Sequence, residues 1–224
     1  MSVKIGFIFD WDGVVVHSND LHERTWFRLA EEEGKPRPTA TNLGNCGMKT
    51  DAVLTRLLKW EISPSDMDRL SFRKEELFRK LVAEQGIESI VGVMEFLRLL
   101  KKRNIPHAVG SSAPRLNIDA GMKALKLENN FQAIVAGEDV IHGKPAPDIF
   151  LKAAASMGLK PEQCIVFEDA PAGVEAARAA GMKVVGILST HEAAALAKAT
   201  GLARDFTEVQ LEELLSWSTG VMEC

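Results

Sequence analysis

Short, continuous apolar runs alternate with amphipathic stretches along most of this 224-residue chain, and this alternation constrains its fold more than any other feature. The apolar runs cover residues 3–9, 107–110, 133–136, 164–167 and 184–188. The stretches between and after them have helical spacing and cover residues 91–103, 115–127, 147–157, 173–180 and 192–200. Strands that are apolar on both faces are typical of parallel sheets covered by helices on both sides. The sequence therefore predicts an α/β fold.

One long segment interrupts the alternation. Residues 17–86 show no convincing strand pattern and have helical spacing at 20–33, 49–60 and 64–84. A strand-free run of about 70 residues exceeds an ordinary crossover, which favours an inserted helical cap over helices packed on the sheet. We therefore expect a Rossmann-like, doubly wound parallel sheet core formed by residues 1–16 and 87–224. The helical cap would comprise residues 17–86.

Composition and charge exclude several classes of protein. Hydrophobic residues make up 46% and charged residues 26%, which is ordinary globular usage. A formal net charge of −4 without a basic stripe argues against nucleic-acid binding. No apolar run approaches the roughly 18 residues that span a bilayer. The three cysteines form no disulfide or zinc pattern, and no secretory signal is evident, so we expect a cytoplasmic location.

Acidic residues follow two of the predicted strands. Asp10 and Asp12 follow the first strand together with Gly13, and Glu168 and Asp169 follow the fourth. Ligands of open α/β sheets bind beyond the carboxyl ends of the strands, and Mg²⁺ prefers oxygen ligands. A glycine there allows a ligand to approach the backbone closely. Taken singly, Asp-Gly is also a common turn, and one of the later acids can cap a helix.

Serine and lysine side chains occupy two further loops after strands. Ser111 and Ser112 follow the second strand, and Lys144 is held between a glycine and a proline after the third. Hydroxyl and backbone N–H groups bind phosphate oxygens, and a lysine would neutralise nearby carboxylates and a phosphate. Either serine can instead cap the following helix, and the lysine can be an exposed loop residue. Together the four strand ends favour phosphoryl transfer.

In this order and spacing the motifs resemble those of the haloacid dehalogenase superfamily, in the subgroup similar to β-phosphoglucomutase. The resemblance extends from residue 7 to about residue 215. It is carried by Phe9-Asp-Trp-Asp-Gly-Val-Val, Val109-Gly-Ser-Ser, Gly143-Lys-Pro-Ala-Pro-Asp and Phe167-Glu-Asp-Ala-Pro-Ala-Gly.

The resemblance implies roles for the catalytic residues. Asp10 would be the nucleophile that forms an aspartyl phosphate, and Asp12 would be the general acid/base. Ser111 and Lys144 would bind the phosphoryl oxygens. An aspartate two residues after the nucleophile is absent from dehalogenases of the family, so its presence favours phosphate-ester chemistry. Trp11 between them is expected to turn away from the acids into the core.

The resemblance also implies a Mg²⁺ site. The metal would be held by Asp10, by the backbone carbonyl of Asp12 and by Asp169. Glu168 would assist directly or through water. Physical reasoning agrees, because an anionic Asp10 cannot readily approach a phosphate dianion unless Mg²⁺ and Lys144 cancel charge.

The cap would select the substrate. Ser18, His22 and Trp26 are four residues apart and therefore share one helix face. The resemblance implies that His22 positions the acid/base, whereas Trp26 lines the cap or packs in its core. A segment containing Gly47 and Lys49 would form a specificity loop, with Lys49 placed to bind a distal phosphate. Simpler interpretations remain open for Ser18 as a helix cap, and for His22 and Lys49 as solvated side chains.

We expect a Mg²⁺-dependent phosphatase of a small phosphorylated metabolite, most simply a sugar phosphate. The alternative is a phosphohexomutase such as β-phosphoglucomutase, which must hold two phosphates; Lys49 and Arg115 are candidates for the second. The run from Ser112 to Arg115 departs from the polar run of the true mutase, which favours the phosphatase. A non-catalytic binding module is a third hypothesis, disfavoured by the intact set of site residues. The sequence leaves the oligomeric state open and is compatible with a monomer.

Overall fold

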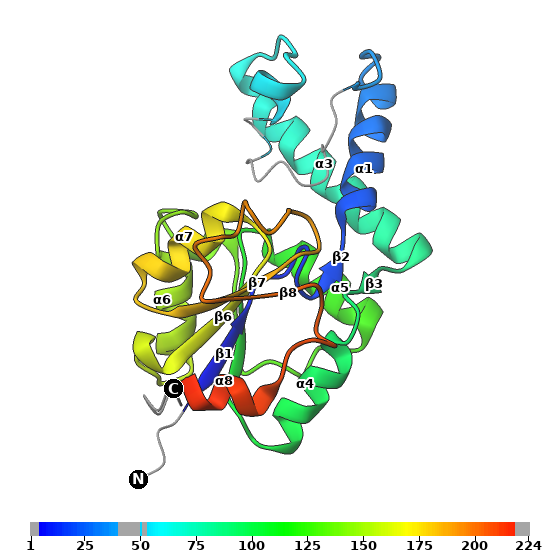
Figure 1. Ribbon diagram of the computed structural model, residues 1–224. Helices are drawn as coiled ribbons and strands as arrows, with labels where there is room; N and C mark the ends of the chain where they lie inside the picture. Colours follow the sequence, from blue (N-terminus) through cyan, green and yellow to red (C-terminus); the bar gives the residue numbers. More distant parts are fainter. Residues whose placement is uncertain (1–4, 40–49, 51–52, 218–224) are drawn as a thin grey trace.

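A six-stranded parallel sheet lies at the centre of the core (Figure 1). The computed structural model describes residues 5–39, 50 and 53–217. The strand order is β5-β4-β1-β6-β7-β8. The strands are β1 (Gly6–Phe9), β4 (His107–Gly110), β5 (Ala133–Val135), β6 (Cys164–Glu168), β7 (Lys183–Ile187) and β8 (Gly201–Ala203). The predicted α/β fold with a doubly wound parallel sheet is thus confirmed.

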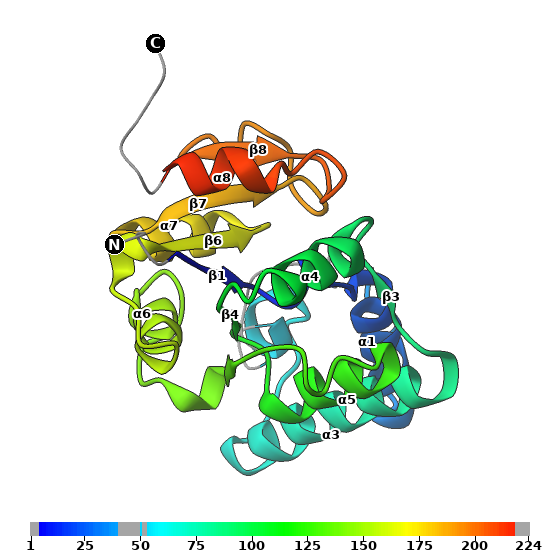
Figure 2. The same cartoon turned by 90° about the horizontal axis from the view of Figure 1, so that it is seen from below.

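Helices cover both faces of this sheet, as Figure 2 shows from below. One face carries α4 (Val93–Lys102), α5 (Arg115–Leu125) and α8 (Leu211–Trp217), and the other carries α6 (Asp148–Ser156) and α7 (Pro171–Ala179). Short 3₁₀ helices span Gly137–Asp139 and Pro161–Gln163. Side chains alternate along β1, so that Phe7 and Phe9 enter one apolar cluster and Ile8 enters the other. Within the described ranges, none of the helices combines the length and apolar character that a bilayer crossing requires.

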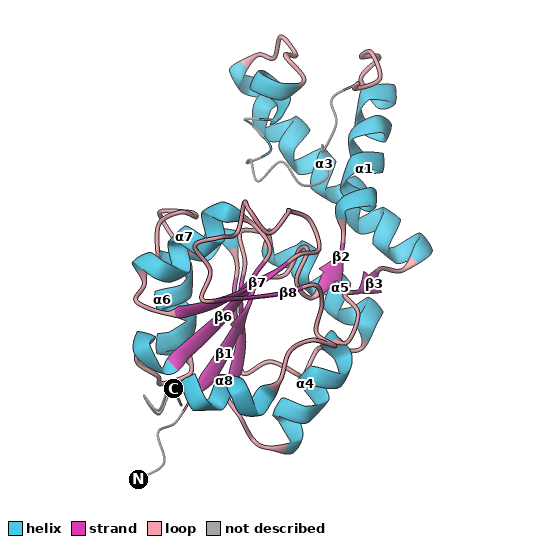
Figure 3. Ribbon diagram, viewed as in Figure 1, coloured by secondary structure: helices cyan, strands magenta, loops and turns pink. Residues whose placement is uncertain are grey.

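The remaining helices stand above the carboxyl edge of the sheet (Figures 1 and 3). They are α1 (Asn19–Glu32), a π-helical turn (Val53–Leu57) and α3 (Pro64–Gln85). They bury an apolar cluster of their own, which includes Trp26, Leu54 and Leu77. Where the chain leaves and re-enters the core, β2 (Val16–His17) pairs antiparallel with β3 (Glu88–Ser89). Ser18 precedes α1 at the N-cap position, but its side chain makes no capping hydrogen bond.

Residues 192–203 differ from the prediction in two ways. The helix expected at 192–200 is wrong, because these residues form turns. The segment is rich in alanine, which favours helix locally, but Leu196 is its one buried residue. Helices in proteins are stabilised mainly by packing an apolar face, and this segment has none to offer. Strand β8 was not predicted, because only three residues pair with β7.

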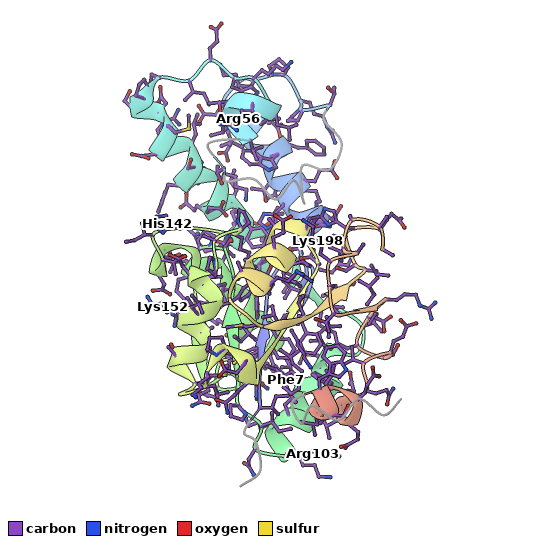
Figure 4. All side chains as sticks on the ribbon, turned by 60° about the vertical axis from the view of Figure 1, so that its left-hand side comes forward. Phe7, Arg56, Arg103, His142, Lys152 and Lys198 are labelled. Carbon is purple, nitrogen blue, oxygen red and sulfur yellow. The ribbon has the colours of Figure 1, made fainter. Side chains whose placement is uncertain are left out.

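An aromatic cluster fills the space between the sheet and α4. Phe7 is fully buried, and its ring centroid lies 5.8 Å from those of Phe96 and Phe167. Figure 4 places Phe7 deep among packed side chains, whereas Arg103 and Lys152 lie at the periphery. Because β1 passes through the middle of the sheet, this packing also fixes the strand that Asp10 directly follows.

Replacement of a buried ring should therefore be far more damaging than replacement of an exposed one. We expect Phe7→Ala to lower the free energy of unfolding by about 3–5 kcal/mol, through lost burial and a residual cavity. The matched control is Phe72→Ala on α3, whose side chain is 63% exposed and should change stability little. Urea unfolding followed by circular dichroism measures both, and equal losses would contradict this account of the core.

Candidate active site

The site is assembled by the register of the sheet. Phe9 of β1 pairs with Val109 of β4 on one side and with Phe167 of β6 on the other. The strands therefore end nearly level, and the residues that follow them meet at one edge. Asp10, Ser111 and Asp169 come together there, as the sequence predicts.

Three buried carboxylates and one buried lysine form the floor of the site. Oxygens of Asp10, Glu168 and Asp169 all lie within 4.8 Å of one another. The Lys144 ammonium lies 3.0 Å from Asp10 Oδ2 and 2.6 Å from Glu168 Oε1. Its charge also lies 4.9 Å from the centre of the Phe150 ring. The loop lysine singled out in the sequence is thus an internal counter-ion and not an exposed side chain.

The charges in this cluster do not balance. Burial raises the pKa of Asp10 to about 7, with Lys144 opposing and Glu168 adding to the effect. Burial and the two neighbouring carboxylates also raise the pKa of Asp169. Burial acts against the charged form of Lys144, but Asp10 and Glu168 outweigh it and raise its pKa. One lysine charge serves three acids, so a hard cation with a preference for oxygen fits this donor set.

Two glycines make room for the carboxylates. A Cβ at Gly13, whose φ is +74°, would lie 2.1 Å from Asp169 Oδ2. A Cβ at Gly173 would lie 1.6 Å from Glu168 Oε1. Gly13 was predicted to let a ligand approach the backbone, and the structure places it next to the Asp169 carboxylate. Either substitution to alanine would displace an acid of the cluster.

The backbone and the loop after β7 hold these acids in place. Glu168 Oε2 accepts hydrogen bonds from the backbone N–H groups of Asp169, at 2.6 Å, and Ala170, at 2.7 Å. The Thr190 hydroxyl donates to the Asp169 carboxylate. His191 Nδ1 lies 2.9 Å from the Asp169 carbonyl oxygen. Backbone groups of the motif itself therefore orient Glu168, whereas residues outside the motifs hold Asp169.

Asp12 lines the same cavity and faces the helical segment. Its Oδ1 lies 3.6 Å from Nε2 of His22. Burial acts to raise the pKa of Asp12, but His22, Ser18 and Lys74 outweigh it and lower the pKa. The His22 ring stacks on Phe78 of α3 at a centroid distance of 4.1 Å. His22 is therefore a packed residue at the site and not a solvated one.

Trp11, between the two acids, points into the core as predicted. It is 1% exposed and belongs to the cluster beneath the sheet. Gly121 of α5 leaves space for its ring, because a Cβ there would lie 2.8 Å from Trp11 Cζ2. The Trp11 side chain is buried in the core, whereas Asp10 and Asp12 on either side of it line the cavity.

A cavity of about 590 Å³ lies between the sheet edge and the helical segment. This is within the range of small-molecule sites. The predicted site residues that line it are Asp10, Asp12, His22, Trp26, Ser111, Ser112, Lys144, Glu168 and Asp169. Trp26 also belongs to the apolar cluster of α1, the π-helical turn and α3. Gly47 and Lys49 lie outside the described residues.

Arg115 is not part of the cavity lining. Its side chain is 45% exposed and pairs with Asp119 at 3.1 Å, one turn along α5. Its backbone N–H donates to the Glu138 carboxylate at 3.0 Å. The neighbouring serines do not cap α5 either, because Pro114 occupies that position and the Ser111 hydroxyl accepts from Ala113 N–H at 3.2 Å.

Several residues of the site carry no signal in the sequence. The cavity is lined by Lys74, Glu75 and Asn117, which sit in helices rich in charged residues. Their spacing is that of ordinary solvated helix faces. Only the packing of α3 against α5 brings them to the site. Thr190 was likewise unpredictable, because it reaches Asp169 from a loop 21 positions away.

Comparisons with known proteins agree with the motifs. The family model described as haloacid dehalogenase-like hydrolase matches residues 6–181. The chain is 36% identical over 94% of its length to an Arabidopsis thaliana 5-amino-6-(5-phospho-D-ribitylamino)uracil phosphatase, and spans 57% of that relative. It is 32% identical to the Escherichia coli fructose-1-phosphate phosphatase YqaB, over 81% of this chain and 95% of that one.

Solved structures show the same fold. The β-phosphoglucomutase of Clostridium difficile superposes with a TM-score of 0.82 at 26% identity, covering 96% of this chain and 97% of that one. The shared fold, the family-model match over residues 6–181 and the sequence identity to the phosphatases all indicate the same family. The chain therefore belongs to the haloacid dehalogenase-like hydrolase family.

Proposed function

We propose that the chain is a Mg²⁺-dependent phosphatase of a small phosphorylated metabolite, a sugar phosphate in the simplest case. The observation that carries the proposal is the buried cluster of Asp10, Glu168 and Asp169 with Lys144, at the floor of the cavity. Two relatives named as phosphatases, one for a ribitylaminouracil phosphate and one for fructose 1-phosphate, support this reaction class.

The first step is attack of the Asp10 carboxylate on phosphorus. A P–O bond forms to Asp10, and the bond to the leaving oxygen breaks, giving an aspartyl phosphate. Lys144 and the Ser111 hydroxyl hold the phosphoryl oxygens. Lys144 already contacts Asp10 at 3.0 Å, so nucleophile and phosphate would share one counter-charge.

Asp12 moves the protons of both steps. It gives its proton to the leaving oxygen, so that the product departs as an alcohol. It then takes a proton from water as the water attacks the aspartyl phosphate, which frees phosphate and regenerates Asp10. A phosphate dianion in the cavity raises the proton affinity of Asp12 and opposes the effect of His22 and Lys74.

Mg²⁺ fits the donor set described above. Asp10, Asp169 and the backbone carbonyl of Asp12 would hold it, with Glu168 assisting directly or through water. When bound, the ion supplies positive charge that offsets repulsion between Asp10 and the phosphate dianion. Burial, together with the neighbouring carboxylates, raises the pKa of Asp10 and of Asp169, and a bound cation would favour their charged forms.

We infer further that residues 17–86 act as a substrate-selecting cap on a core formed by residues 1–16 and 87–224. The support is that α1 and α3 bury their own cluster and supply His22, Trp26 and Lys74 to the cavity. The floor of the cavity is the same for any phosphate monoester, so the cap side chains would choose the leaving group.

Removal of the nucleophile should abolish the reaction without unfolding the chain. We expect Asp10→Asn to reduce phosphate release from a sugar-phosphate panel by at least about 10³-fold. The control is Asp68→Asn on the exposed surface of α3, which should keep full activity. Circular dichroism checks that both variants are folded, and substantial activity in Asp10→Asn would refute the mechanism.

Removal of the metal should be equally informative. We expect EDTA to abolish phosphate release and added Mg²⁺ to restore it. Mg²⁺ should also raise the melting temperature of the metal-free wild type, because an ion that binds only the native state stabilises it. Asp169→Asn should lose that increase. Activity that is indifferent to the chelator would remove the metal from the mechanism.

The mutase alternative is favoured by the structural match to β-phosphoglucomutase, and the test must separate the two reactions. With the panel, including fructose 1-phosphate and 5-amino-6-(5-phospho-D-ribitylamino)uracil, we expect phosphate release to exceed isomerisation. The comparison is β-glucose 1-phosphate with a bisphosphate primer. The position of Arg115 outside the cavity lining supports the phosphatase, and primer-dependent isomerisation that outruns phosphate release would overturn it.

A further inference from the structure

Lys74 of α3 determines which nitrogen of His22 carries the proton. Its ammonium lies 3.0 Å from His22 Nδ1 and 3.0 Å from Glu75 Oε1. An ammonium only donates hydrogen bonds, so His22 Nδ1 accepts and the ring proton resides on Nε2. That nitrogen faces Asp12 Oδ1 at 3.6 Å. The protonated face of His22 is thus aimed at Asp12 by a residue of another helix.

Glu75 continues the connection from α3 to the core. Its Oε2 accepts a hydrogen bond of 2.6 Å from Nδ2 of Asn117 on α5. Asn117 in turn accepts at Oδ1 from Arg79 of α3, at 3.0 Å. The Thr50 hydroxyl donates to Glu75 Oε1 at 3.1 Å. Both ends of the Asn117 amide and both oxygens of Glu75 are therefore engaged.

These contacts are shielded from water. Lys74 and Asn117 are buried, and the Glu75 side chain is 15% exposed. Burial acts to raise the pKa of Glu75, but Lys74 and His22 outweigh it and lower the pKa, so Glu75 is held as a carboxylate. A buried carboxylate or amide that loses its partner is costly, which makes the set cooperative.

We infer that Glu75 and Asn117 form a latch that couples docking of α3 on α5 to the positioning of His22 and Lys74 against Asp12. The inference rests on the proposed function, in which Asp12 is the acid/base. Asn117 lines the cavity, and in this scheme it acts on Asp12 through Glu75 and Lys74. With α3 lifted from α5, Glu75 loses its amide donor and Lys74 loses a fixed partner. The acid/base would then be fully assembled only when the cavity is covered.

The test exchanges the carboxylate of Glu75 and the amide of Asn117, so that donor and acceptor swap positions. Asn117→Asp places a second carboxylate against Glu75, and Glu75→Gln sets an amide beside both Lys74 and Asn117. In the double variant every bond can re-form: Gln at 75 donates to Asp at 117 and accepts from Lys74, and Asp at 117 still accepts from Arg79. The net charge of the protein is also restored.

For each variant kcat/KM is measured with the most rapidly cleaved sugar phosphate of the panel and with 4-nitrophenyl phosphate. We expect each single change to lower kcat/KM on the sugar phosphate by about 10- to 100-fold, as misplaced catalytic groups do. The double variant should recover to within about threefold of wild type. The decrease in kcat/KM on 4-nitrophenyl phosphate should be several-fold smaller than that on the sugar phosphate, because the 4-nitrophenolate leaving group departs without a proton from Asp12. The matched control is Glu76→Gln, whose side chain is 50% exposed and pairs with Arg73.

Amide hydrogen exchange provides a readout that does not depend on activity. Each single variant should exchange at least about tenfold faster than wild type in 64–85 and 115–125, with protection regained in the double variant. Unchanged exchange in the single variants overturns the latch even if the enzyme is a phosphatase. Regained protection with no phosphate release from any probe would support the latch and reject the proposed function. Equal losses on both substrates without recovery in the double variant would show a merely structural role.

Discussion

The contact of Lys144 with Asp10 and Glu168 is the interaction on which the site depends. It places one positive charge among three buried acids, and a pair of buried ions is tolerated only when its hydrogen bonds are complete. The backbone N–H groups after β6 complete those of Glu168. The remaining surplus of negative charge is what makes the floor receptive to a cation. The balance of charges inside the buried cluster, and not the net charge of the whole protein, thus determines which ions the site can bind.

The fold was largely predictable because its strands are apolar on both faces. Buried parallel strands such as β1 and β6 read as continuous apolar runs, and α7, which follows β6, buries Val174 and its neighbouring alanines. The errors occurred where local preference and tertiary packing disagree. The alanine-rich residues 192–200 favour helix in isolation, but Leu196 is the one buried residue among them. They therefore lack the apolar face that would hold a helix on the core. Strand β8 exists only because β7 offers an edge.

The site was predictable wherever the sheet itself brings residues together. Asp10, Ser111 and Asp169 follow neighbouring strands, so parallel register alone predicts their meeting. Lys74 and Asn117 follow no such rule, because they belong to different helices whose contact depends on how the helical segment packs on the core. Their helical spacing is indistinguishable from that of a solvated face. The pairing of Arg115 with Asp119, in contrast, has a spacing of four residues on one helix and can be read from the sequence.

The same packing explains why the contact between α3 and α5 is partly polar. Leu21, Phe78 and Leu81 form a small apolar cluster that touches Ala120 of α5. A larger apolar interface would hold the helices permanently over the cavity, whereas polar groups can exchange their partners for water at modest net cost. A substrate must enter and a product must leave between these elements. A small apolar contact reinforced by directional hydrogen bonds therefore satisfies both demands, because it specifies one docked geometry and still permits release.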